Sequence, residues 1–240
     1  MATVTLPVVS AHAAKKDVPS VLATCTSSLK LVLFLTLPSI FFLSVAARPV
    51  ISALYQHGLF KYADTVFTSQ ALVFYCLGLF AYASVRVVAP IFYAMGDTKT
   101  PVKASALAVI VNIGLNLAFM RPLGFRGLAL ATSLAAMVNM FTLVILLRRR
   151  VGPLDLRDLG GSFFRLLGCS GLMGAVLYFS QLGWRLDLEV ARLPEKALYV
   201  LVLFALAAGS YALFARLLKV RELGLVMGIF KGLKTGGSSR

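Results

Sequence analysis

The chain has 240 residues, of which 59% are hydrophobic and 14% are charged. This composition is too apolar for a soluble domain of that length and predicts a membrane protein. The net charge of +15 does not indicate a nucleic-acid partner, because long apolar stretches separate the basic residues and prevent a continuous basic face.

The chain opens with a short apolar segment, Met1–Val9, that is too short to cross a bilayer. It lacks a basic region followed by a cleavage site, so we do not expect a signal peptide. We interpret it as the end of a helix whose beginning is missing, followed by a basic turn at Lys15.

Six apolar stretches then reach the length of about 20 residues that a spanning helix needs. No Asp or Glu lies deep inside any of them. The predicted fold class is an all-α polytopic membrane protein with six transmembrane helices. The predicted spans are Leu29–Ala53, Val66–Tyr93, Pro101–Met120, Phe125–Leu147, Phe163–Leu182 and Ala197–Leu218.

The basic residues are distributed unevenly between the two sides. When the turns are numbered alternately, 16 lysines and arginines, among them Lys30 and Arg148–Arg150, fall on one side and seven on the other. Basic turns favour the cytoplasm, so both termini are predicted to be cytoplasmic. The same residues are expected to contact anionic headgroups of the membrane lipids.

Prolines and one charge interrupt the apolar spans. Pro38 and Pro90 each remove a helix hydrogen bond and favour a kink, and Pro90 deprives the Arg86 carbonyl of its usual partner. Arg86 is the only charged residue predicted to lie well inside a span. Its guanidinium is expected either to face a bundle interior or wet cavity, or to extend to the inner headgroups.

The turn between the second and third spans carries a well-formed set of helix-boundary residues. Gly96 is a suitable helix stop, and Thr98 or Thr100 could cap the next helix. Pro101 then falls in the first helical turn, where its missing N–H is harmless. These residues predict a tight turn between two helices.

Two amides on the third span form the only candidate ion site. Asn112 and Asn116 are four residues apart and therefore share one helix face. With Thr132 on the fourth span, they could offer oxygen ligands to a monovalent cation. The alternative is that they simply form hydrogen bonds between helices.

No catalytic or metal-binding set emerges from the sequence. The two histidines, His12 and His57, fall in turns on opposite sides, and the three cysteines do not have the spacing of metal ligands. Neither an enzyme nor a cofactor is predicted. After the last span, Arg216–Lys234 is either an amphipathic helix on the inner leaflet or a frayed basic tail.

Several strings in the first 150 residues resemble the MurJ/MviN lipid II flippases of the multidrug/oligosaccharidyl-lipid/polysaccharide exporter superfamily. The strings agree with that family in their residues, in their order along the chain and in the spacing between them. The strings are Pro7-Val-Val-Ser10, Arg48-Pro-Val-Ile51, Gln56-His-Gly-Leu-Phe60 with Asp64-Thr65, Pro90-x-Phe92-Tyr93-Ala94, Asp97-Thr-Lys-Thr-Pro-Val102 and Gly124-x-x-Gly127-Leu-Ala-Leu-Ala-Thr132-Ser133.

The resemblance implies a fourteen-helix fold with two six-helix lobes and two extra helices beside a groove for a lipid tail. Residues 1–150 would then be the end of helix eight and helices nine to twelve. Residues 151–218 would be the two extra helices, and residues 219–240 a basic cytoplasmic tail. By the same resemblance, the protein would act in the bacterial inner membrane on the undecaprenyl-linked peptidoglycan precursor.

The family's substrate-contacting residues lie mainly in a lobe that this chain lacks, so the chain alone is not expected to move lipid. The resemblance places Arg86 at a basic, substrate-binding position, and Asn112, Asn116 and Thr132 at an ion site. The implied partners are the lipid-linked precursor, membrane lipids and an N-terminal half in the same or a separate chain. The alternatives are another exporter of the superfamily, for polysaccharide lipids or drugs, and a non-transporting membrane scaffold.

Overall fold

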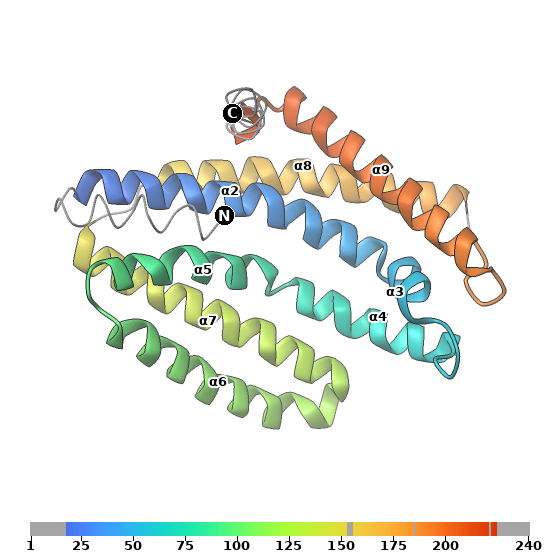
Figure 1. Cartoon of the computed structure of the whole chain (residues 1–240), viewed down its shortest axis with the longest axis horizontal. Coiled ribbons are helices and arrows are strands. Elements are labelled where there is room, and N and C mark those ends of the chain that lie inside the picture. The colour runs from blue at the N-terminus through green and yellow to red at the C-terminus, as the bar shows by residue number, and fades with distance from the viewer. Residues whose placement is uncertain (1–17, 153–155, 185, 221, 225–240) are drawn as a thin grey trace, which may run out of the picture.

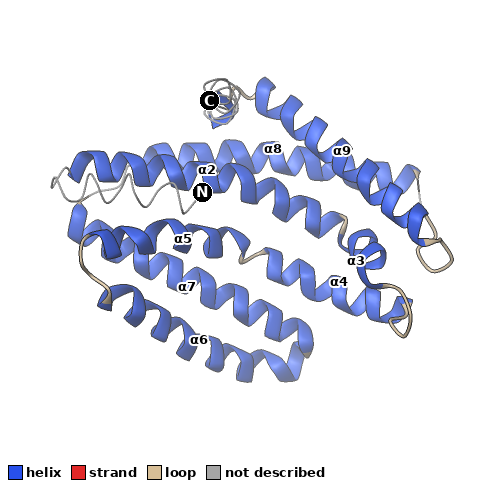
Figure 2. Cartoon of the chain, viewed as in Figure 1, coloured by secondary structure: helices blue, strands red, loops and turns tan. Residues whose placement is uncertain are grey.

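The computed structural model describes residues 18–152, 156–184, 186–220 and 222–224, and there the chain consists of helices joined by short loops (Figures 1 and 2). The predicted all-α fold class is confirmed. The predicted helix end at Met1–Val9 and the tail from residue 225 onward lie outside the described residues. The helices are α2 (Val18–Val45), α3 (Ala47–Tyr55), α4 (Tyr62–Cys76), α5 (Leu79–Ala94), α6 (Lys99–Leu123), α7 (Phe125–Val151), α8 (Leu156–Gly183) and α9 (Leu193–Leu217).

Six spans can be counted in this arrangement. The helices α2, α6, α7, α8 and α9 are each long and apolar enough to cross a membrane. The remaining predicted span corresponds to α4 and α5 together, which are bent relative to each other by 42°. The chain is therefore a multi-pass membrane protein, with six spans when the bent pair is counted as one.

The first predicted span was placed incorrectly at both ends. Its helix begins at Val18 instead of Leu29 and ends at Val45 instead of Ala53. Lys30 consequently lies within a helix and not in a turn. Arg86 is therefore not the only basic side chain that a spanning helix carries well away from its ends.

Pro49 accounts for the early end of α2. In a continuous helix, the Val45 carbonyl would need an N–H from residue 49, but proline has none and its ring would collide with that carbonyl. The chain instead starts α3, which carries Pro49 in its first turn, where proline is tolerated. The Val45 carbonyl accepts a 3.3 Å hydrogen bond from the Gln181 amide nitrogen on α8.

The second span breaks at a glycine and not at its proline, since α5 continues through Pro90. The N–H of Gly78 bonds to the Tyr75 carbonyl at 3.1 Å, so the Phe74 carbonyl has no helical partner. The hydroxyl of Ser133 on α7 donates to that Phe74 carbonyl at 2.7 Å. A Cβ on Gly78 would lie 2.8 Å from the Ser133 Cα, so this close approach requires glycine.

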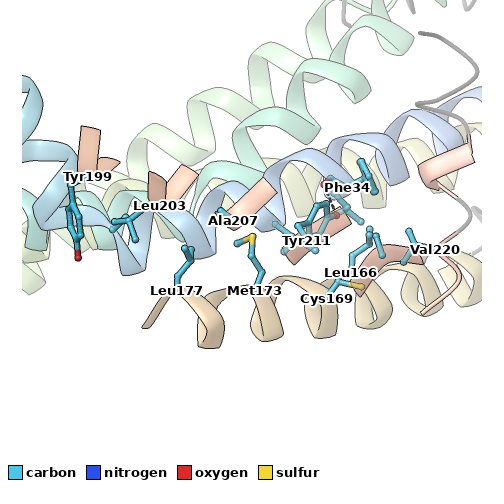
Figure 3. Close-up of a cluster of buried hydrophobic side chains, with 14 residues drawn as sticks. Phe34, Leu166, Cys169, Met173, Leu177, Tyr199, Leu203, Ala207, Tyr211 and Val220 are labelled. Carbon is cyan, nitrogen blue, oxygen red and sulfur yellow. Dashed lines mark hydrogen bonds between the residues drawn. The ribbon is translucent and has the colours of Figure 1, made fainter. Parts of the chain in front are cut away.

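The last two helices pack against α2 around a buried apolar cluster (Figure 3). The helix α2 continues through Pro38, which leaves the Phe34 carbonyl without an N–H partner. The Tyr211 hydroxyl of α9 donates a 2.9 Å hydrogen bond to that carbonyl. The buried residues of the cluster include Leu33, Phe34, Leu37, Leu166, Cys169, Met173, Leu177, Tyr199, Leu203, Ala207, Tyr211 and Ala215.

The other helices form a second packed group. A buried cluster joins α2, α5 and α7, with Val88, Ile91, Phe92, Leu143 and Leu147 at its centre. The helix α6 forms a hairpin with α7 and is the least covered of the five long spans. Figure 1 shows this hairpin on the side of the bundle away from α8 and α9.

Two ion pairs link neighbouring helices on the side of the basic turns. Asp97, between α5 and α6, pairs with Arg150 at the end of α7. Lys30 of α2 pairs with Asp158 in the first turn of α8. These contacts bring the turns around residues 95–98 and 150–158 to the same end of the bundle, as alternate numbering of the turns predicted.

Candidate functional site

Arg86 lies on the uncovered face of α5. Its neighbours Val87 and Val88 are buried against the bundle, whereas the Arg86 side chain is exposed. Within the described residues, no hydrogen bond or ion pair involves its guanidinium. A charge held on this face is available to a ligand, a headgroup or a part of the protein beyond these helices.

The two amides of α6 contact each other. The Asn116 Nδ2 donates to the Asn112 Oδ1 at 3.0 Å, which confirms that the two side chains share a helix face. The Asn116 Oδ1 is buried and accepts no hydrogen bond from the described residues. A buried acceptor without a donor is costly, so this oxygen is available to a cation or to a donor outside the described part of the chain.

Thr132 is not joined to these amides by a hydrogen bond. Its hydroxyl donates to the Leu128 carbonyl of its own helix at 2.8 Å. The adjacent Ser133 hydroxyl is occupied by the α4–α5 break. The described residues contain no group of three or more His, Cys, Asp or Glu side chains that could hold a metal ion. The three-residue cation site therefore remains a prediction.

The turn that the sequence singled out is capped differently from the prediction. No side-chain hydrogen bond caps α6 from Thr98. Instead, the Asp97 carboxylate accepts hydrogen bonds from the Thr100 backbone N–H at 3.0 Å and from the Thr100 hydroxyl at 2.7 Å. Because Asp97 also pairs with Arg150, one carboxylate both starts α6 and ties it to the end of α7.

The structure also contains a cavity of about 690 Å³ that sequence reasoning missed. It lies at the end of the bundle opposite the basic turns, between α4 and the α8–α9 pair. No motif could have revealed it, because its walls come from segments more than 100 residues apart. It is lined by Ser44, Val45, Ala47, Arg48, Pro49, Tyr62, Ser69, Gln70, Val73, Tyr178, Gln181, Leu182, Leu186, Asp187, Leu188 and Tyr199.

Comparison with known proteins gives a consistent result. The family model described as lipid II flippase MurJ matches residues 1–215. A probable lipid II flippase MurJ from Vibrio cholerae is 32% identical over 225 residues, which cover 92% of this chain and 42% of that protein. The lipid II flippase MurJ of Thermosipho africanus is 37% identical over 117 residues, covering 49% of this chain and 25% of that protein.

A solved structure agrees with the sequence matches. It is a lipid II flippase MurJ in an inward closed conformation, with a TM-score of 0.73 and 26% sequence identity. The alignment covers 90% of this chain and 42% of the solved one. The chain thus spans less than half the length of the proteins that it resembles.

Proposed function

Because this chain belongs to the lipid II flippase MurJ family, we propose that it supplies the C-terminal part of a transporter that moves lipid II across the bacterial inner membrane. The observation that carries the proposal is the agreement of sequence and fold over the same region. The family match covers residues 1–215, and the structural match covers 90% of the chain with a TM-score of 0.73.

The two packed groups of helices support different roles for two parts of the chain. We assign residues 1–150 to a lobe of the fourteen-helix fold and residues 151–218 to the two extra helices beside the lipid-tail groove. Large apolar side chains on α8 and α9 are well exposed, for example Phe164 at 72% and Leu201 at 63%. Such a surface is suited to contact with an acyl or polyprenyl chain.

Arg86 is the residue of this chain that we assign to substrate binding. An intramembrane guanidinium that is exposed and unpaired in the described residues can bind a phosphate by donating bidentate hydrogen bonds to its oxygens. We assign Asn112, Asn116 and Thr132 to a monovalent cation site. The buried Asn116 Oδ1 that lacks a donor supports this role.

The chain needs an N-terminal half, in the same or a separate polypeptide, for transport. One guanidinium inside the spans cannot replace the hydration shell of a pyrophosphate-sugar headgroup. Alternating access also requires two bundles that rock against each other around the site. We place both termini in the cytoplasm, because the basic turns gather at one end of the bundle.

A chimera tests the proposal. Residues 1–240 of this chain replace the matching C-terminal segment of the Vibrio cholerae relative, in cells depleted of their own flippase. We expect growth and externally accessible lipid II with the chimera, and neither with the 240-residue chain alone. The Arg86→Gln chimera tests the role of that residue. It should accumulate in the membrane normally but transport less.

The outcome also separates the alternatives. A chimera that reaches the membrane at normal levels but leaves lipid II inside would contradict the proposal. Export of a different polysaccharide lipid or of a cationic drug would favour another transporter of the superfamily. A normal Arg86→Gln chimera would contradict the role assigned to that residue and leave the family assignment intact.

A further inference from the structure

The 690 Å³ cavity lies at the end of the bundle away from the basic turns. Its walls come from the last turns of α2 and α8, the first turn of α3, the α8–α9 loop, the early part of α9, and α4 from its first residue, Tyr62, to Val73 in its last turn. Tyr178 lines it and is 59% exposed, and Trp184, just beyond α8, is 52% exposed. Aromatic side chains of this kind are typical of the membrane–water boundary. The volume is within the range of about 300–1,000 Å³ of small-molecule sites.

The cavity holds one cation and one anion that are not paired with each other. Arg48, in the first turn of α3, and Asp187, in the α8–α9 loop, both line it. The ion pairs of the described residues are Asp97–Arg150 and Lys30–Asp158, so neither Arg48 nor Asp187 is neutralised there. Asp187 uses one oxygen to accept the Glu189 N–H at 3.0 Å. Its second oxygen and the whole guanidinium remain available.

A third polar group in the same wall also lacks a partner. The Gln70 Oε1 on α4 is buried and accepts no hydrogen bond from the described residues. It is an acceptor, so it suits a ligand that carries donors. A bare phosphate or sulfate could accept hydrogen bonds from Arg48. It would, however, be repelled by the Asp187 carboxylate and would offer no donor to the Gln70 Oε1.

We propose that the cavity binds the headgroup of a phospholipid that carries both a phosphate and a primary ammonium. The phosphate contacts the Arg48 guanidinium, and the ammonium contacts the Asp187 carboxylate. The apolar part of the wall, Val45, Val73 and Leu182, takes the upper part of the lipid chains. The ligand is a resident lipid that bridges the bundle and the α8–α9 pair, and its binding does not depend on lipid II transport.

Native mass spectrometry of the purified 240-residue chain tests the site. The probes are phosphatidylethanolamine, phosphatidylcholine and phosphatidylglycerol with identical acyl chains, together with soluble glycerophosphoethanolamine. We expect phosphatidylethanolamine to bind about tenfold more tightly than the other two lipids, which corresponds to about 1.4 kcal/mol. The soluble headgroup should bind far more weakly, because it lacks the chains.

Two substitutions test the phosphate contact and the ammonium contact separately. Arg48→Gln should weaken all three lipids about equally, whereas Asp187→Asn should remove the preference for phosphatidylethanolamine over phosphatidylglycerol. The matched controls are Arg121→Gln and Glu189→Gln, at exposed residues of the same end that do not line the cavity. Both controls should bind the lipids as the unmodified chain does.

The preference within one variant is independent of the amount of folded protein, so a folding defect cannot imitate the loss of preference expected for Asp187→Asn. An unmodified chain without preference among the three lipids would overturn the proposal. So would an Asp187→Asn variant that keeps the preference, or an Arg48→Gln variant that binds as the Arg121→Gln control does. Tight binding of soluble glycerophosphoethanolamine would show that the site takes a soluble ligand and not a lipid.

Discussion

The Tyr211 hydroxyl on α9 donates a hydrogen bond of 2.9 Å to the Phe34 carbonyl on α2, the carbonyl that Pro38 leaves without a helical partner. Two similar contacts occur elsewhere. Gln181 bonds to the Val45 carbonyl that faces Pro49, and Ser133 bonds to the Phe74 carbonyl at the α4–α5 break. In each case a side chain from another helix satisfies an interrupted backbone, and for Phe34 and Phe74, inside the spans, the absence of water in the bilayer core makes such a partner necessary.

The Tyr211 contact should therefore depend on the proline. Tyr211→Phe should lower the free energy of unfolding by about 0.6–2 kcal/mol, because it leaves a buried carbonyl unsatisfied. In a Pro38→Ala background the helix supplies its own N–H, so the effect should shrink. Thermal unfolding in detergent of both single variants and the double variant measures this coupling. Tyr178→Phe, at an exposed tyrosine, is the control. An equal loss in both backgrounds would contradict the interpretation.

The α4–α5 break should not tolerate a side chain at its glycine. A Cβ on Gly78 would lie 2.8 Å from the Ser133 Cα, so Gly78→Ala should force the helices apart and cost about 1–3 kcal/mol. Gly114→Ala on α6 is the control, because no atom lies within 4 Å of its Cβ position. There the lower conformational freedom of alanine should be neutral or stabilising by up to about 1 kcal/mol. Equal unfolding temperatures for the two variants would exclude the clash.

Asp97 should matter more to stability than its partner Arg150. Asp97→Ala removes the cap of α6, worth about 1 kcal/mol, together with the ion pair. Arg150→Gln removes only an ion pair whose arginine side chain is 47% exposed, worth less than about 1 kcal/mol.

Thermal unfolding at low and high salt distinguishes the two contributions. The effect of Arg150→Gln should disappear at about 1 M salt, where charges are screened within about 3 Å. Most of the effect of Asp97→Ala should persist, because a cap is a short-range hydrogen bond. Arg149→Gln, at a neighbouring exposed arginine, is the control. If high salt abolished both effects equally, Asp97 would act through its charge alone.

The number of spans and most turn positions could be predicted from the sequence, because they depend on local features. A run of about 20 apolar residues sets each span, and Gly96, with a φ of 76°, ends α5 as expected. The end of α2 at Val45 has a local cause, Pro49, that the predicted span Leu29–Ala53 did not take into account. The break at Gly78 and the partner of the Val45 carbonyl could not be predicted, because they depend on side chains distant in sequence. Ser133 is 59 residues away from Phe74, and Gln181 is 136 residues away from Val45.

The same reason limits prediction of the sites. Asn112 and Asn116 were recognised because helical spacing alone puts them together. The cavity was not, because Arg48 and Asp187 are brought to one place only by the packing of α8 and α9 on α2 and α3. A chain without an acidic residue inside its spans offers little local signal for a charged site.

The amide pair should respond to sodium if it forms a cation site. At a tenfold excess over the dissociation constant, a bound ion stabilises the folded state by about 1.4 kcal/mol. Replacing choline by sodium should therefore raise the unfolding temperature of the unmodified chain, and Asn116→Leu and Thr132→Val should abolish that rise. Ser210→Ala, at a hydroxyl that bonds only to its own helix in the described chain, should retain it. A rise that survives in Asn116→Leu would exclude the site.

The orientation of the bundle can be tested by labelling single introduced cysteines. The native residues Cys25, Cys76 and Cys169 are buried, so a membrane-impermeant maleimide should leave them unmodified. Leu59→Cys, in the turn before α4, replaces a side chain that is 96% exposed and should react in intact cells. Arg149→Cys should react only after the membrane is permeabilised, because the basic end is expected to face the cytoplasm. Labelling of Arg149→Cys in intact cells would show that the bundle has the opposite orientation. The Arg48 cavity would then lie at the inner surface and would contact lipids of the cytoplasmic leaflet.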